Sequence, residues 1–299
     1  MPVISEEYQT LVLDDIRSFE GLSHPVRACL LERLLVRRLS LARLHPNPTD
    51  EFCDPNIGPS YDTVLKYVHA WGETKHPHEE LEKGKLCVEK MSAGGYMLLD
   101  GHHRWLAAHR LGMKRFPVTV MNATPVERIV KAMNRSDRRM CVSFDLDEVL
   151  LTKPGTPEAE PKAPPAVLRT LPGAMRRNAP LLIRELRDMG FDVWVYTAGF
   201  VPESTMKRMF SFYRFRTDGI VNGLRNREHR AALRKAFSEN YDVSLHVDTK
   251  SVVWVNNRTR EYDIVDIEAH RGEWSAQVMR TVRALPPVQA HLAQTGGKA

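Results

Sequence analysis

Residues 141–150 read Cys-Val-Ser-Phe-Asp-Leu-Asp-Glu-Val-Leu, and this stretch decides the fold that the sequence predicts. A short apolar run ends at two carboxylates, Asp145 and Asp147, spaced i, i+2. Such a run is typical of a buried parallel strand. Because the chain turns past the strand end, both acids can converge in the crevice where open α/β sheets bind ligands. There they can hold Mg²⁺, and one can act as a nucleophile. The alternative for Asp-x-Asp alone is a solvated turn.

The chain after residue 139 alternates between strand and helix patterns. We expect strands at 141–144, 192–196, 243–247, 252–255 and 264–267, and helices at about 174–188, 203–212 and 228–240. This order predicts an α/β fold with a parallel sheet and crossover helices. A proline-rich loop is expected at 153–165, and the tail at 284–299 is expected to be disordered.

Polar residues follow two of these expected strands. Thr197 comes after the strand at 192–196 and stands close to Gly199, which suits contact with a phosphoryl oxygen. Asp248 comes after the strand at 243–247 and offers a further carboxylate. The helix between them is basic, with Arg230 and Lys235 as candidates to bind an anion, and the spacing does not choose between these two.

Over residues 140–270 these motifs resemble the haloacid dehalogenase (HAD) superfamily of phosphotransferases. The resemblance implies a Rossmann-like, three-layer fold and a Mg²⁺-dependent phosphomonoester hydrolase. Asp145 would form an aspartyl-phosphate, and Asp147 would act as general acid and base. Thr197 with Arg230 or Lys235 would hold the transferring group.

The same resemblance implies a metal site made by Asp145, Asp147 and Asp248. The fourth motif of the family commonly has two acids, whereas here Thr249 follows Asp248. The missing acid predicts weaker Mg²⁺ binding and weak or lost activity.

A second motif, Asp100-Gly101-His102-His103-Arg104, lies between an expected strand at 96–99 and an expected helix at 105–111. The amino end of a helix is favourable for anions. Gly101 lets the backbone come close to a ligand, and an arginine such as Arg104 can bind phosphate through two hydrogen bonds.

This motif, with His45-Pro46-Asn47-Pro48 upstream, resembles the ParB/sulfiredoxin superfamily over residues 33–122. The Asp-Gly-His-x-Arg form is most similar to the free-serine kinases of that superfamily. The resemblance implies a smaller α+β domain that binds a nucleotide (ATP, ADP or CTP), and a kinase activity in which Glu51 would be the base.

Length and composition fit this two-domain interpretation. The chain has 299 residues, a formal net charge of +6 and four scattered cysteines that indicate neither disulfides nor a zinc site. We expect an extension at 1–32, the nucleotide-binding domain at 33–122, a connecting helix at 123–138, the phosphatase domain at 139–283 and a tail. No apolar run is long enough to span a membrane, which predicts a cytoplasmic protein.

The sequence therefore predicts a two-domain phosphoryl-transfer enzyme. Its substrate would be phosphorylated and could be a small molecule, a protein or a nucleic-acid end. The alternative is a ParB-like protein that binds a nucleotide or nucleic acid, with an inactive HAD fold as scaffold. The basic net charge fits either phosphorylated ligands or nucleic acid.

Overall fold

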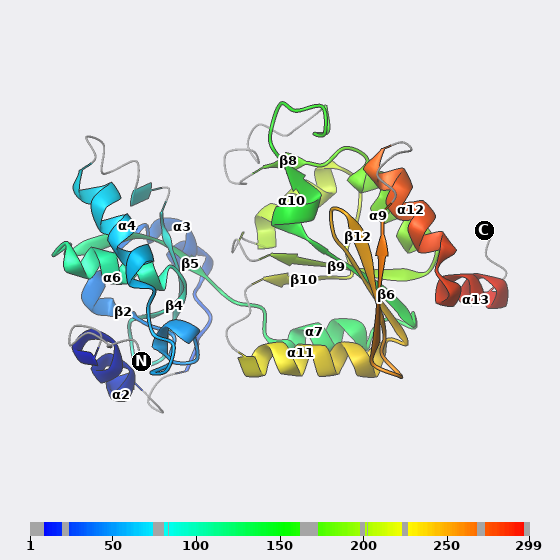
Figure 1. The fold of residues 1–299 in the computed structure, drawn as a ribbon. Coiled ribbons are helices and arrows are strands. Elements are labelled where there is room, and N and C mark those ends of the chain that lie inside the picture. The colour runs from blue at the N-terminus through cyan, green and yellow to red at the C-terminus, as the bar shows by residue number, and fades with distance from the viewer. Residues whose placement is uncertain are drawn as a thin grey trace. The chain divides into compact units, whose positions relative to one another are not determined.

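A computed structural model describes residues 9–19, 24–73, 81, 82, 84–161, 173–197, 201, 203–222, 227–267 and 273–295. The chain divides into two compact units: unit 1 is Met1–Ala123 with Arg225–Arg227, and unit 2 is Thr124–Leu224 with Glu228–Ala299. Both are built from helices around a sheet (Figure 1), which makes this an α/β protein. Within the described part of the chain, no helix is both long and apolar enough to cross a lipid bilayer.

Unit 1 contains a five-stranded mixed sheet in the order β1-β5-β3-β4-β2. The strands are β1 (Arg38–Ser40), β2 (Leu44–His45), β3 (Leu86–Lys90), β4 (Tyr96–Asp100) and β5 (Arg115–Met121). Its helices and helical turns are η1 (Gln9–Leu13), α2 (Asp14–Phe19), α3 (Leu30–Leu35), η2 (Leu41–Arg43), η3 (Glu51–Cys53), α4 (Tyr61–Gly72) and α6 (His102–Arg110).

Two sequence predictions for unit 1 need correction. The leucines at 39, 41 and 44 predict one short strand, but the turn η2 interrupts it; Leu41 is buried in that turn and its amide donates to the carbonyl of Lys114. The N-terminal extension belongs to the unit, because Val12 and Ala28 are buried in its core. Both departures arise from tertiary packing, which local sequence periodicity does not report.

Unit 2 contains a six-stranded sheet in the order β10-β9-β6-β11-β12-β13. The four strands β10 (Gly219–Asn222), β9 (Phe191–Thr197), β6 (Met140–Asp145) and β11 (Val243–Val247) are parallel. The strands β12 (Ser251–Asn256) and β13 (Glu261–Asp266) are antiparallel, which corrects the expectation of a wholly parallel sheet. The short connections before them cannot hold the crossover that a parallel strand requires.

Helices cover both faces of this sheet (Figure 1). On one face lie α7 (Val126–Met133) and α11 (Arg227–Asn240), packed around Trp194. The other face packs against α9 (Ala179–Asp188), α10 (Glu203–Phe212), α12 (Trp274–Ala284) and α13 (Pro286–Thr295). The expected connecting helix is therefore α7, a part of unit 2.

Three further segments of unit 2 differ from the sequence predictions. The helix expected from residue 174 begins at Ala179, because β8 (Ala174–Met175) pairs with β7 (Leu151–Thr152). The short strand β10 was not predicted. Residues 286–295, expected to be disordered, form α13, which buries Val288 and Leu292 in the core.

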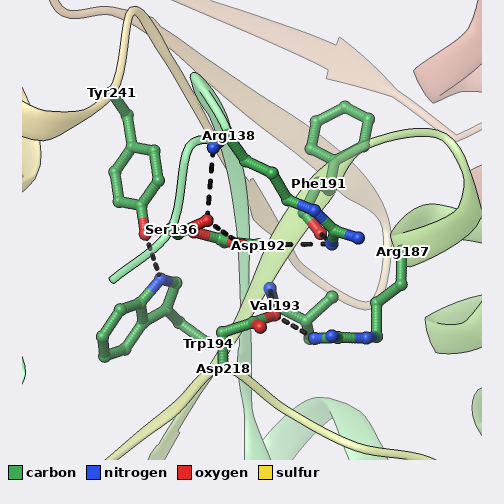
Figure 2. A network of polar contacts seen from close by, with 9 residues as sticks. All are labelled: Ser136, Arg138, Arg187, Phe191, Asp192, Val193, Trp194, Asp218 and Tyr241. Atoms are coloured by element: carbon green, nitrogen blue, oxygen red, sulfur yellow. Dashed lines mark hydrogen bonds and ion pairs between the residues drawn. The ribbon is translucent and has the colours of Figure 1, made fainter. Parts of the chain in front are cut away.

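A buried polar network fixes the start of β9 (Figure 2). The Asp192 carboxylate accepts hydrogen bonds from Ser136 at 3.0 Å and from the Tyr241 hydroxyl at 2.8 Å, and Trp194 donates to that hydroxyl at 3.0 Å. Burial raises the pKa of Asp192. Since Ser136 precedes β6, this network attaches the segment that leads into β6 to the neighbouring strand.

Candidate functional sites

The carboxyl ends of three adjacent parallel strands carry the predicted residues of unit 2. Asp145 ends β6 and lies beside Tyr196 of β9, and Phe144 lies beside Val247 of β11. Thr197 and Asp248, the next residues along β9 and β11, therefore leave the sheet at the same edge as Asp145. Neighbouring strands are about 4.8 Å apart, so all three residues start within two strand spacings.

A one-turn π-helix, η4 (Leu146–Leu150), follows Asp145 and places Asp147. Leu146, Val149 and Leu150 are buried, which anchors this turn in the core. The buried Thr197 hydroxyl donates to Asp147 Oδ2 at 2.9 Å. The structure thus joins two predicted site residues that are 50 positions apart in the chain.

The Asp145 carboxylate has a neighbour that the sequence analysis missed. His246 of β11 lies beside Ser143 in the sheet, and its Nε2 is 3.5 Å from Asp145 Oδ2. Its Nδ1 is 3.1 Å from the Ser143 hydroxyl. The alternation of side chains along a strand could have indicated this neighbour. Leu245 and Val247 are buried in the core, so His246 between them must point to the opposite face of the sheet.

Asp248 is exposed, and its Oδ1 accepts hydrogen bonds from the amide of Thr249 at 2.6 Å and from the Thr249 hydroxyl at 3.3 Å. Among the described residues, no group of three or more histidine, cysteine or acidic side chains is arranged to hold a metal ion. The structure therefore brings the backbones of Asp145 and Asp248 to one edge without gathering the three predicted carboxylates.

The two basic candidates, Arg230 and Lys235, lie at different heights on α11. This helix follows β10 and precedes β11, so it starts at the carboxyl edge of the parallel strands and runs back to the other edge. Both side chains are exposed, and Lys235 Nζ is 3.8 Å from Glu239 Oε1. At 1.5 Å per residue, Arg230 lies about 7.5 Å nearer the site edge than Lys235.

In unit 1 the second motif lines a cleft of about 250 Å³. The lining residues are Asp50, Thr63, Tyr67, Leu99, Asp100, Gly101, His102, His103 and Arg104. Gly101 is left-handed at φ 99°, and a Cβ at this position would lie 2.5 Å from Leu86 Cδ2. Glycine therefore permits the tight passage from β4 into α6. The helix begins at His102, so the two histidines and Arg104 form its first turn.

Both histidines accept backbone hydrogen bonds through Nε2. The amide of Asn47 donates to His102 at 3.2 Å, and the amide of Ser60 donates to His103 at 3.0 Å. Burial lowers the pKa of both rings, which agrees with two imidazoles that must stay neutral to accept. His102 is 5% exposed and also lies 3.8 Å from Asp50. These rings therefore fix the surrounding loops.

Arg104 is held at the floor of the cleft. Its guanidinium donates to Asp100 Oδ2 at 2.6 Å and to the carbonyl of Lys85 at 3.0 Å. A guanidinium has five N–H donors, so further donors remain for a ligand. The amides of the first helical turn also lack partners inside the helix.

The predicted base Glu51 is exposed in η3 and is not among the residues that line the cleft. Asp50, its neighbour, lines the cleft instead, and its Oδ1 accepts from the amide of Phe52 at 3.0 Å. The sequence signal for Asp50 was its capping position before a short helical turn, which directs its carboxylate toward the following amides.

Comparison of the chain with protein-family models found no matching family, and comparison with curated proteins found no match.

Proposed function

We propose that unit 2 is a Mg²⁺-dependent phosphomonoesterase of the HAD type. The hydrogen bond between Thr197 and Asp147, beside Asp145 at one sheet edge, carries this proposal. It brings the carboxylates of Asp145 and Asp147 and the Thr197 hydroxyl, from β6, η4 and β9, to one edge of the sheet, where they would serve as nucleophile, proton donor and phosphate-binding group. The Asp145 side chain is 39% exposed and can be reached by a substrate.

The chemistry follows from these positions. An oxygen of Asp145 attacks phosphorus, the ester P–O bond breaks, and Asp147 gives a proton to the leaving oxygen. Water then attacks the aspartyl-phosphate while Asp147 takes its proton, which releases inorganic phosphate and restores Asp145. Thr197 donates its single hydroxyl hydrogen to Asp147 in the free site and would turn it to an oxygen of the transferring group once a phosphoester is bound.

The residues at this edge fit a hard divalent cation in their chemistry, because carboxylate and carbonyl oxygens are the ligands that Mg²⁺ prefers. Asp145, the carbonyl of Asp147 and Asp248 would hold it. The bound ion would neutralise charge on the phosphoryl oxygens. Arg230, in the first turn of α11, would add a second positive charge near the same edge.

The test is release of phosphate from an aryl phosphate in the presence of Mg²⁺. Asp145→Asn should abolish turnover, while Glu148→Gln, which alters an exposed acid in the same turn, should leave it unchanged. Arg230→Ala should reduce turnover more than Lys235→Ala. Turnover that survives Asp145→Asn would refute the proposal, as would its absence from the folded wild-type chain.

For unit 1 we propose that the cleft binds the phosphates of a nucleotide. Its volume of about 250 Å³ lies below the ~300 Å³ that encloses a drug-sized ligand. It would therefore hold phosphates and leave the base near Tyr67. The amides of α6 and the free donors of Arg104 would bind the anion. Asp50, a carboxylate of the cleft lining, would take the proton from a substrate hydroxyl in a kinase reaction.

Nucleotide binding is tested by the melting of the full chain with ATP, ADP or CTP. A ligand that binds the folded form raises the melting temperature. Arg104→Ala should remove the rise, whereas Lys114→Ala, an exposed basic residue outside the cleft lining, should retain it. Equal shifts in both variants would place the nucleotide elsewhere. Binding of nucleic acid that weakens steeply with salt, without phosphate release, would favour the scaffold alternative.

A further inference from the structure

His246 lies on a part of the unit 2 sheet that helices leave open. The residues beside it on the same face are partly exposed, and at the sheet edge Tyr262 and Ile264 are 69% and 70% exposed. The His246 side chain is itself 38% exposed and that of Asp145 is 39% exposed. An ion from solution can therefore reach both groups.

Hydrogen bonds to the protein select one tautomer of His246. The Ser143 hydroxyl lies 3.1 Å from the carbonyl of Leu245, which can only accept, and 3.1 Å from His246 Nδ1. The arrangement that satisfies all three groups has Ser143 donating to Leu245 and Nδ1–H donating to Ser143. In the neutral ring the remaining nitrogen, Nε2, then carries the lone pair.

This tautomer turns two electron-pair donors toward each other. Nε2 of His246 and Oδ2 of Asp145 are 3.5 Å apart, which is beyond hydrogen-bond range. Two ligand atoms that each lie about 2.1 Å from one cation are about 3.0 to 3.4 Å apart, depending on the coordination geometry. The observed separation is close to that of two ligands of a shared cation.

We propose that His246 Nε2 is a ligand of the cation site of unit 2 and gives it a preference for borderline transition-metal ions over Mg²⁺. Imidazole suits zinc-like ions, whereas Mg²⁺ prefers oxygen. A metal-binding histidine usually donates its other N–H to a protein acceptor, as His246 does to Ser143. The inference rests on the proposed function, because it adds a nitrogen ligand beside the proposed nucleophile.

The experiment measures binding of Co²⁺ and of Mg²⁺ to the full chain by calorimetry, with the visible spectrum of Co²⁺ as a second readout. Wild type should bind Co²⁺ at least tenfold more tightly than Mg²⁺. His246→Phe should weaken Co²⁺ binding at least tenfold and alter the spectrum, while the Kd for Mg²⁺ changes less than threefold. Ser143→Ala, which removes the contact that supports His246 together with the hydrogen bond to the Leu245 carbonyl, should weaken Co²⁺ binding about 10- to 100-fold.

His69→Phe is the matched control. His69 and Glu73 on α4 also bring an imidazole nitrogen and a carboxylate oxygen to 3.5 Å, but they are 68% and 78% exposed. This variant should keep wild-type Co²⁺ binding. Circular dichroism melting verifies that each variant is folded.

Unchanged Co²⁺ affinity and spectrum in His246→Phe would overturn the inference. The same holds if His246→Phe weakens Co²⁺ and Mg²⁺ equally. Neither result would contradict the proposed phosphatase function. That function is refuted by a different result, namely phosphate release that does not depend on Asp145.

Discussion

Mild acid should destabilise unit 1 through the histidines of α6. His102 and His103 accept backbone amides at Nε2, and a protonated ring cannot do so. Burial lowers the pKa of both, and of His109 in the same helix, below the ordinary value. The unfolded chain takes up these protons below about pH 6.5 while the folded unit resists them. Stability is therefore complete above that pH and is lost as the pH falls below it.

The magnitude follows from this linkage. At pH 5.5, one histidine that is neutral when folded and has an unfolded pKa near 6.5 lowers the free energy of unfolding by about 1.4 kcal/mol. His102 is 5% exposed and should contribute the largest share, at most this amount. His103 and His109 are only partly buried, so the three together should lower the free energy of unfolding by at most about 4 kcal/mol. That is a large fraction of the ~5–15 kcal/mol by which a typical domain is stable.

Hydrogen exchange of the full chain at pH 7.5 and 5.5, corrected for the intrinsic rate, gives this free energy for peptides of each unit. The peptides of β3 and β5 should lose protection, and His102→Gln should make the loss smaller by up to about 1.4 kcal/mol. His69→Gln, on the exposed face of α4, should not alter it. A unit 1 that is equally stable at both pH values, or an unchanged loss in His102→Gln, would refute the reasoning.

Three substitutions test the packing that supports the sites, each by chemical denaturation. Gly101→Ala should lower the free energy of unfolding by at least about 1 kcal/mol, because it adds a Cβ to a left-handed residue against Leu86. An unchanged free energy would mean that a side chain does not strain the turn between β4 and α6. Tyr241→Phe should cost about 1–3 kcal/mol, since it removes a donor from the buried Asp192. No loss there would show that the network of Figure 2 is dispensable. Leu292→Ala should cost about 2–5 kcal/mol if α13 packs into the core, whereas a free tail would tolerate it.

Much of the parallel part of unit 2 could be predicted from the sequence. The strand β11 and the helix α10 have the bounds that the pattern predicted, and Asp145 ends β6. These elements are long or strongly apolar, so local periodicity is enough to find them. The short strand β10 and the pair β7 and β8 have too few residues to show a period.

Side-chain directions were harder to predict than element positions. Glu51 and Asp50 are equally good candidates by residue type, and only the fold of η3 decides that Asp50 lines the cleft. His246 was not predicted because it lies inside an expected strand, whereas the predicted site residues lie where strands end. What singles it out is its contact with Ser143 and Asp145 on the adjacent strand, and these lie about a hundred residues earlier in the chain.

The histidines of the two units differ in which ring nitrogen contacts the protein, and this difference separates the structural rings of unit 1 from the proposed ligand in unit 2. In unit 1, backbone amides already occupy the lone pairs of His102 and His103, so neither ring has an Nε2 to offer a ligand. In unit 2, Ser143 contacts His246 Nδ1, and in the neutral tautomer inferred above the lone pair of Nε2 faces Asp145. His102 is far more buried than His246, so burial alone would favour His102 as the functional histidine. The direction of its hydrogen bond shows that this burial serves the fold, whereas the partly exposed His246 would keep a nitrogen for the proposed cation site.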